Sequence, residues 1–155
     1  MNRPTLNQPA DLWHVDGSLR DIYVFSTIAS DWDALLVLAQ TYPHEYTQDG
    51  IPHSLPAAAA LFRDREHSHL LSILTGAVRI NCHFFVPEEI ELDIDPWEVI
   101  DQEKHVAVLQ FVERLAQATR KDAVVTPENT PDKALLQYDH ASQVWQVHEL
   151  PASDA

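Results

Sequence analysis

Eight carboxylates lie within a stretch of sixteen residues, 88–103, which reads EEIELDIDPWEVIDQE and contains no Lys or Arg. Carboxylates at close spacing can bind a divalent cation, exchange protons with a substrate, or attract a basic protein. Glu91, Asp93 and Asp95 alternate with apolar residues, which is the period of a strand that has one solvated face. These three carboxylates are therefore the first candidate site.

The spacing of these carboxylates restricts the chemistry they can perform. Alternate side chains on one strand lie about 6.8 Å apart, whereas Ca²⁺ or Mg²⁺ needs oxygens at about 2.0–2.6 Å. A single strand cannot enclose such an ion, and we predict neither a metal nor a cofactor. Three interpretations stay open: a solvated outer face, a docking surface for a basic protein, and a carboxylate pair for acid–base catalysis.

His83 supplies the acid–base alternative. It shares a predicted strand face with Arg79 and Asn81, and it lies opposite the acidic strand if the two strands pair as a hairpin. A small hydrolase or metal-dependent enzyme could then use His83, Glu91 and Asp93, although a cross-strand charge pair is the commoner arrangement. Neither G-x-S-x-G nor H-E-x-x-H occurs, so no catalytic residue is assigned outright.

Two further reactive residue types have plainer interpretations. His67-Ser68-His69 forms an H-x-H pattern of the kind that can bind a metal, but it follows a predicted helix, where His side chains favour the free carbonyls. Cys82 alternates with Ile80 and Phe84, so we expect a buried thiol that is not a nucleophile.

Trp97 completes the candidate docking surface. Asp95-Pro96-Trp97-Glu98 has the pattern of a helix start, with an N-cap carboxylate and Pro at the first helical position. We expect the Trp97 ring to be at least partly exposed at the rim of the acidic surface, where it could contact a partner's Lys or Arg; the alternative is a ring that folds back onto the sheet. The candidate partner-binding residues are Glu91, Asp93, Asp95, Trp97 and Glu98.

The elements that position these residues follow from periodicity and turn signals. Apolar residues at helical spacing predict helices that begin near Ser30 and end before Pro43, that run from about 57 to 66, and that run from about 102 to 120. Asp16-Gly17 predicts an opening hairpin between residues 12–15 and 18–25. The other predicted strands cover residues 70–74, 77–85, 90–94, 123–126, 134–138 and 143–148.

This order lacks the regular βαβα alternation of a parallel sheet. We predict an α+β fold with one mostly antiparallel sheet and helices packed on one face. A length of 155 residues suits a single domain over 1–155. We expect residues 1–11 and 150–155 to be loose termini.

Composition excludes several classes of function. Ten Lys plus Arg against 24 Asp plus Glu give a net charge of −14, which disfavours nucleic acid and anionic membranes as partners. Only three glycines are present, too few for the glycine-rich phosphate loops of Rossmann or P-loop enzymes. The sequence shows neither a secretory signal nor a long apolar run, and we expect a cytoplasmic protein.

Three segments carry a resemblance to a known type of protein: DGSLRDIYV, CHFF-x-PEEIELDIDP and VVTPEN. Together with the order of helices and strands, they resemble small acidic bacterial proteins of the type found as immunity proteins in toxin–immunity systems. The resemblance implies a protein-binding role and carries no catalytic residue.

The favoured function is therefore a binding or inhibitory protein whose acidic face docks a basic protein partner. A hydrolase that uses His83 with the carboxylates is the second hypothesis. The third is a structural or regulatory homodimer that associates through an uncovered sheet face bearing Phe85 or Trp145.

Overall fold

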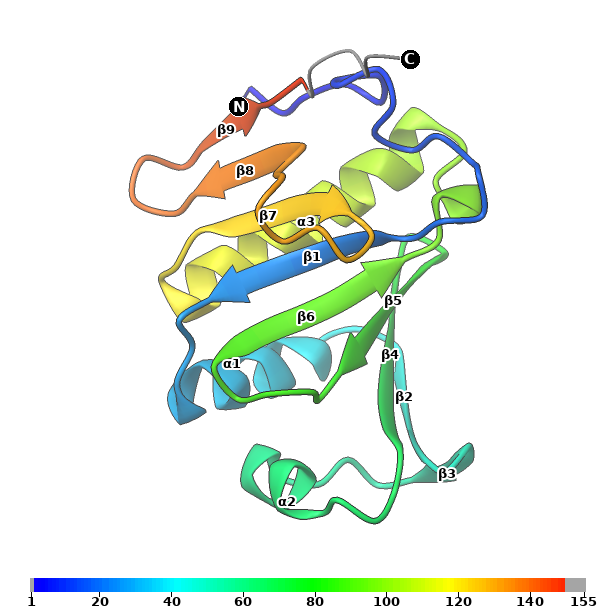
Figure 1. Ribbon diagram of the computed structural model, residues 1–155, viewed down its shortest axis with the longest axis vertical. Helices are drawn as coiled ribbons and strands as arrows, with labels where there is room; N and C mark the ends of the chain where they lie inside the picture. The colour runs from blue at the N-terminus through cyan, green and yellow to red at the C-terminus, as the bar shows by residue number, and fades with distance from the viewer. Residues whose placement is uncertain (1, 150–155) are drawn as a thin grey trace.

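A single sheet organises the chain, as shown by a computed structural model that describes residues 2–149. The strand order is β3-β2-β4-β5-β6-β1-β7-β8-β9, and every neighbouring pair is antiparallel (Figure 1). The strands are β1 Arg20–Phe25, β2 His44–Gln48, β3 Ile51–His53, β4 His69–Thr75, β5 Val78–His83, β6 Glu89–Ile94, β7 Ala123–Pro127, β8 Leu136–Asp139 and β9 Val144–Val147. The α+β fold with an antiparallel sheet is thus confirmed.

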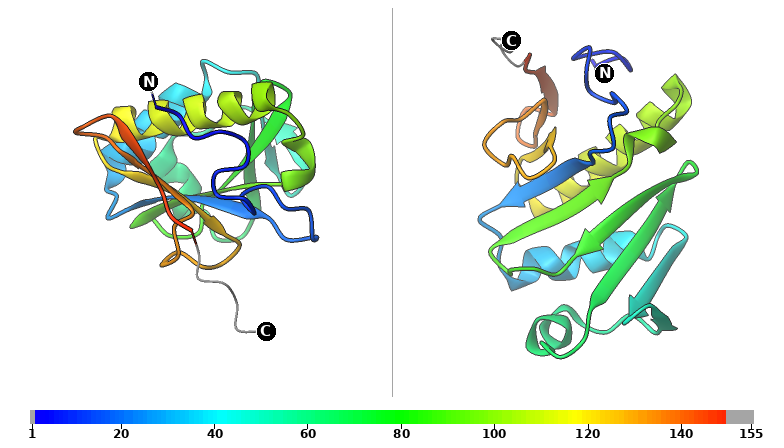
Figure 2. Two further views of the ribbon diagram at one scale, coloured as in Figure 1. Left: turned by 90° about the horizontal axis from the view of Figure 1, so that it is seen from above. Right: turned by 45° about the vertical axis from the view of Figure 1, so that its right-hand side comes forward.

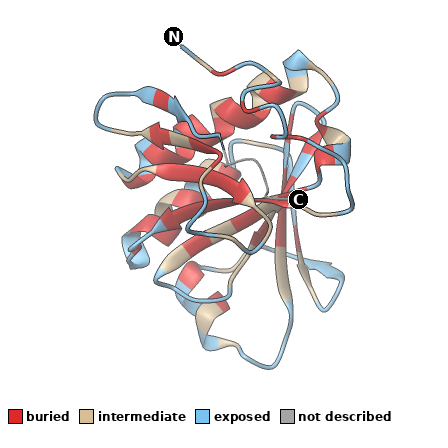
Figure 3. Cartoon of the chain, turned by 45° about the horizontal axis from the view of Figure 1, so that its top comes forward, coloured by how far each residue is buried: buried red, intermediate tan, exposed pale blue. Residues whose placement is uncertain are grey.

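Helices cover one face of this sheet. α1, Ala29–Ala39, and α3, Gln102–Thr119, lie behind it in the view of Figure 1, and the short α2, Ala58–Arg63, sits beside α1 at one end (Figures 1 and 2). The hydrophobic core fills the space between these helices and the sheet (Figure 3). Buried residues alternate along β5 and β6, whereas β1 is buried along most of its length. The opposite face carries no helix in the described part of the chain.

The acidic strand forms as its period predicts. Ile90, Leu92 and Ile94 are fully buried against the helices, whereas Glu91 and Asp93 are half-buried on the other face. β6 lies in the middle of the sheet, between β5 and β1. The carboxylates therefore stand on the bare face and not at an edge.

Two helix boundaries follow from side-chain caps. α3 begins where the Asp101 carboxylate accepts a hydrogen bond from the Lys104 N–H at 2.9 Å, which satisfies one of the free donors of the first turn. Asp31 accepts from the Ile28 N–H at 2.9 Å, so α1 begins one residue earlier than the predicted Ser30.

The predicted opening hairpin is wrong. Asp16-Gly17 does turn the chain, with Gly17 at a φ of +89°, but residues 12–15 form no strand. Both edges of β1 are already occupied, by β6 and β7, which leaves no free edge for a preceding strand. Leu12 instead packs into the core, and the buried Arg20 guanidinium donates to the Leu12 carbonyl at 2.7 Å.

The N-terminal segment, which we expected to be loose, is attached along α3, from Gln102 to Glu113. The Arg3 guanidinium pairs with Glu113 at 2.9 Å, the His105 ring donates to the Pro4 carbonyl at 2.7 Å, and the Leu6 N–H donates to a Gln102 side chain. Residues 150–155 lie outside the described part. No helix among residues 2–149 has the length and apolarity needed to cross a membrane.

Candidate functional site

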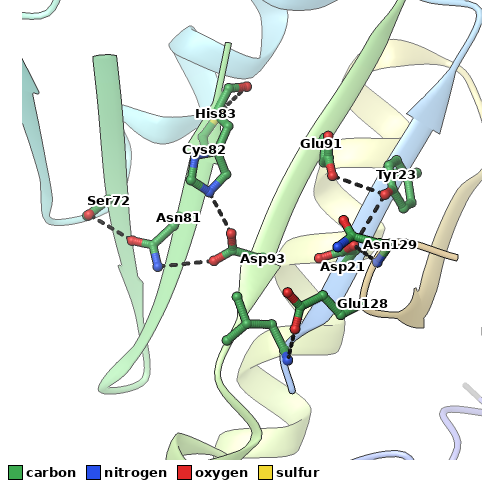
Figure 4. A network of polar contacts seen from close by, with 11 residues as sticks. Asp21, Tyr23, Ser72, Asn81, Cys82, His83, Glu91, Asp93, Glu128 and Asn129 are labelled. Atoms are coloured by element: carbon green, nitrogen blue, oxygen red, sulfur yellow. Dashed lines mark hydrogen bonds and ion pairs between the residues drawn. The ribbon is translucent and has the colours of Figure 1, made fainter. Parts of the chain in front are cut away.

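The bare face of the sheet carries a polar row across its central strands. The antiparallel register places Asn81 of β5, Asp93 of β6 and Asp21 of β1 side by side. The helices occupy the other face, and among residues 2–149 the loop between β7 and β8 covers part of this row (Figure 1). The row divides into two hydrogen-bonded networks (Figure 4).

Asp93 is the centre of the first network. Its Oδ2 lies 2.5 Å from His83 Nε2, and its Oδ1 accepts from the Asn81 amide at 3.2 Å. Asn81 in turn accepts a hydrogen bond from the Ser72 hydroxyl at 2.9 Å. The hydrogen bond that His83 donates to Asp93, with added attraction from neighbouring carboxylates, holds the pKa of His83 above its usual value against the opposing effect of burial.

Tyr23 is the centre of the second network. Its hydroxyl lies 3.0 Å from Glu91 Oε1 and 3.2 Å from Asp21 Oδ2. The Asn129 N–H, from the loop after β7, also donates to Asp21 Oδ2 at 2.8 Å. Burial raises the pKa of Asp21, and the charges of Glu91 and Asp93 add to the increase. Negative charge is thus concentrated on this face.

The three residues of the predicted acid–base centre divide between the two networks. His83 lies directly opposite Glu91 in the register, yet its ring contacts the diagonal neighbour Asp93. Glu91 bonds to Tyr23 instead. The structure therefore joins His83 to one carboxylate and leaves the second in a different set of contacts.

The remaining predicted site residues lie where β6 ends. Pro96–Glu98 form a 3-10 turn, η1, and the Asp95 carboxylate accepts from the Trp97 N–H at 3.0 Å. Glu98 Oε1 accepts from the Arg79 N–H at 2.8 Å. The Trp97 side chain is 71% exposed, which confirms the predicted exposure of this ring.

Within the described residues, no Lys or Arg pairs with the carboxylates of the bare face, and the His83 ring is the basic group that contacts Asp93. Among residues 2–149, the ion pairs that involve Lys or Arg join Arg3 to Glu113, Lys104 to Asp101 and Lys121 to Asp31. None of these pairs includes Asp21, Glu91 or Asp93. Within residues 2–149, no three His, Cys, Asp or Glu side chains are grouped so that they could hold a metal ion.

Sequence reasoning missed a pocket of about 310 Å³ beside this face, between the segment after α2 and the end of β5. Asp64 Oδ2 lies 2.8 Å from His67 Nδ1 and 3.2 Å from His69 Nε2, and His83 lines the same pocket. The H-x-H pattern was the available signal, but the approach of His83 depends on tertiary structure. Cys82 is buried as predicted, and burial raises the pKa of its thiol.

No protein-family model, curated protein or solved structure matched this chain. The functional argument therefore rests on the geometry and charge of the described residues.

Proposed function

We propose that this chain is a binding protein of the inhibitory, immunity type, and that its bare sheet face docks a basic protein. The observation that carries the proposal is the row of carboxylates that no Lys or Arg pairs with in the described part of the chain. A partner's basic side chains would supply the missing charge. With a net charge of −14, the chain would also attract such a partner from a distance, in a salt-dependent manner.

Exposed aromatic rings flank the carboxylates. Phe25 stacks on Tyr23 with ring centroids 5.4 Å apart, and Phe85 stacks on His83 at 5.0 Å. Phe25 is 38% exposed and Phe85 is 63% exposed. Aromatic anchors beside charged groups are characteristic of the energetic centres of protein interfaces. The face thus offers both apolar anchors and charge.

A second copy of the chain fits this surface less well than a basic protein. Two identical faces would bring carboxylates against carboxylates, and like charges across an interface are unfavourable. Trp145, which we expected on an uncovered face, is buried and donates to Glu113 at 2.7 Å. We expect light scattering at two protein concentrations to give the monomer mass at both.

The direct test removes charge from the face without disturbing the fold. Asp93 and Asp95 are poor choices, because each accepts hydrogen bonds that organise the chain. Glu45, Glu89 and Glu91 lie on the same face, and the triple variant Glu45→Gln, Glu89→Gln and Glu91→Gln retains a possible acceptor for Tyr23. The matched control is Asp33→Asn, Glu103→Gln and Glu149→Gln, which removes the same charge elsewhere.

We expect immobilised wild type and the control to capture the same basic protein from a lysate of the source cells, identified by mass spectrometry, and the face variant to lose it. Added salt should weaken the capture, because the attraction is electrostatic. Equal capture by the face variant, or a captured protein that is acidic, would contradict the proposal.

Trp97 tests the rim of the same surface. Because its side chain is exposed, we expect Trp97→Ala to change the free energy of unfolding by less than about 0.5 kcal/mol and to weaken capture of the partner. Trp32→Ala is the control for a buried ring and should cost about 3–5 kcal/mol. A large loss of stability in Trp97→Ala would instead give the ring a structural role.

A further inference from the structure

The pocket beside the docking face collects groups that can carry positive charge. Arg65, His67, His69 and His83 line it, together with the single carboxylate Asp64. The chain has 24 Asp and Glu against ten Lys and Arg and nine His. The pocket thus has a local excess of groups that can be positively charged, although the net charge of the chain is negative.

Asp64 and Asp93 are hydrogen-bonded to these rings, and Asp49 Oδ2 lies farther away, 4.0 Å from His67 Nε2. Asp64 and Asp93 also accept hydrogen bonds from other groups of the chain. Asp64 Oδ1 accepts from the Glu66 N–H at 3.0 Å, and its Oδ2 faces His67 and His69. Asp93 accepts from His83 on one oxygen and from Asn81 on the other. Asp64 therefore orients the His67 ring and Asp93 orients the His83 ring, and each carboxylate stabilises the protonated form of the ring that it contacts.

His83 is the hydrogen-bond donor whose position best suits a ligand in the pocket. Its Nε2 is committed to Asp93, while its Nδ1 has no hydrogen-bond partner among the described residues. The side chain is 28% exposed and forms part of the pocket wall. Since a protonated imidazole donates from both nitrogens, Nδ1–H is free for an acceptor in the pocket.

We infer that this pocket binds a small oxyanion, namely the phosphate group of a free phosphate or of a phosphate monoester. Arg65 and the protonated His83 would supply the main charge-assisted donors, with His67 beside them. A guanidinium matches two phosphate oxygens at once, and hydrogen bonds between ionised groups are the strong ones. The volume of about 310 Å³ admits a phosphate with a small substituent, and Phe85 offers that substituent an apolar contact.

Binding should require protonation of His83. The charged and titratable groups that face this ring are Asp93 and Glu91 from β6, Asp21 from β1, and Asp64, Arg65, His67 and His69 across the pocket. When the rings are neutral, the carboxylates outweigh Arg65 and oppose an anion. We therefore expect tighter phosphate binding at about pH 6 than at about pH 8, on either side of the ordinary histidine pKa of about 6.5.

The test is calorimetric titration of the full chain with inorganic phosphate at these two pH values, with NaCl used to hold the ionic strength constant. We expect Arg65→Gln and His83→Gln each to weaken binding at about pH 6 by about tenfold or more, since each removes a charged donor. Arg79→Gln is the control, because Arg79 is exposed and outside the pocket. Phenyl phosphate should bind more tightly than phosphate if the ligand is a monoester, whereas equal affinity would indicate free phosphate.

Absence of phosphate binding at about pH 6, or an equal loss in Arg79→Gln, would overturn the inference. Arg65 is exposed, so Arg65→Gln should fold even if His83→Gln does not. The docking proposal is tested independently: Glu89→Gln changes the docking face outside the pocket and should leave phosphate affinity unchanged.

Discussion

At the scale of single residues, the acidic stretch 88–103 is mainly a set of hydrogen-bond acceptors. Asp95 and Asp101 accept from backbone N–H groups at the starts of η1 and α3, and Glu98 accepts from the Arg79 backbone. Glu91 and Asp93 accept from side chains on the neighbouring strands. Much of the clustered charge is therefore explained by local structure, and Glu89 is among the carboxylates left for a partner.

The Asp93–His83 pair should make stability depend on pH. The folded-state pKa of His83 is raised, chiefly by Asp93, so the stabilisation is fully present below the unfolded-state pKa of about 6.5 and is lost as pH rises through the higher folded-state value. We expect Asp93→Asn to lower the pKa of His83 and to remove this dependence. Histidine-resolved NMR titration and denaturation at about pH 5.5 and about pH 8.5 measure both effects; an unchanged His83 pKa would contradict the pairing.

His105 should give the folding stability the opposite pH dependence. Its Nδ1 accepts from the Trp13 indole at 2.9 Å and its Nε2 donates to the Pro4 carbonyl, so the folded chain holds the neutral ring, and burial lowers its pKa. The stabilisation is present above the unfolded-state pKa and is lost as pH falls through the lower folded-state value. As the pH falls from about 7 to about 5, we expect the free energy of unfolding of wild type to decrease relative to that of His105→Gln. Parallel curves of unfolding free energy against pH for the two proteins would contradict this prediction.

At the scale of elements, local signals predicted the segments that depend on local chemistry. The alternation in β6 and the Asp95 N-cap of η1 were predicted because neighbouring residues determine both. The hairpin at Asp16-Gly17 failed because β1 pairs with β6 and β7, which are distant in sequence. For the same reason, a favourable turn dipeptide cannot show whether the strand that follows it has a free edge for pairing.

The β4–β5 hairpin depends on one glycine. Gly76 has a φ of +54°, and a Cβ at this position would lie 2.6 Å from the Ala107 Cβ on α3. We expect Gly76→Ala to cost roughly 1–2 kcal/mol for its backbone conformation and about 1–3 kcal/mol more for the clash, measured by chemical denaturation.

Two variants separate these contributions. Gly50→Ala also has a positive φ, +79°, but meets no atom within 4 Å, so it should show only the conformational cost. Adding Ala107→Gly to Gly76→Ala should recover part of the loss through coupling between the two sites. Simple additivity would show that the contact with α3 is unimportant.

At the scale of the whole molecule, the functional face exists because of strand order. β1, β6 and β7 come from separate parts of the chain and lie side by side in the sheet (Figure 1). This order brings Asp21 opposite Asp93 and places Asn129 beside Asp21 (Figure 4). The sequence indicated the acids of β6 but not Asp21 or the histidine pocket, because no local pattern specifies which distant strands become neighbours.

The net charge predicts how salt acts on the folded chain. Repulsion among acidic groups is strongest in the compact state, and raising monovalent salt from about 10 to about 150 mM shortens the screening length from about 30 to about 8 Å. We therefore expect NaCl to raise the melting temperature over this range. At matched ionic strength, Mg²⁺ or Ca²⁺ should add nothing further, because residues 2–149 offer no arranged set of three metal ligands. A clear additional rise in melting temperature with either divalent ion would indicate metal binding linked to folding. That result would favour the hypothesis of a metal-dependent enzyme.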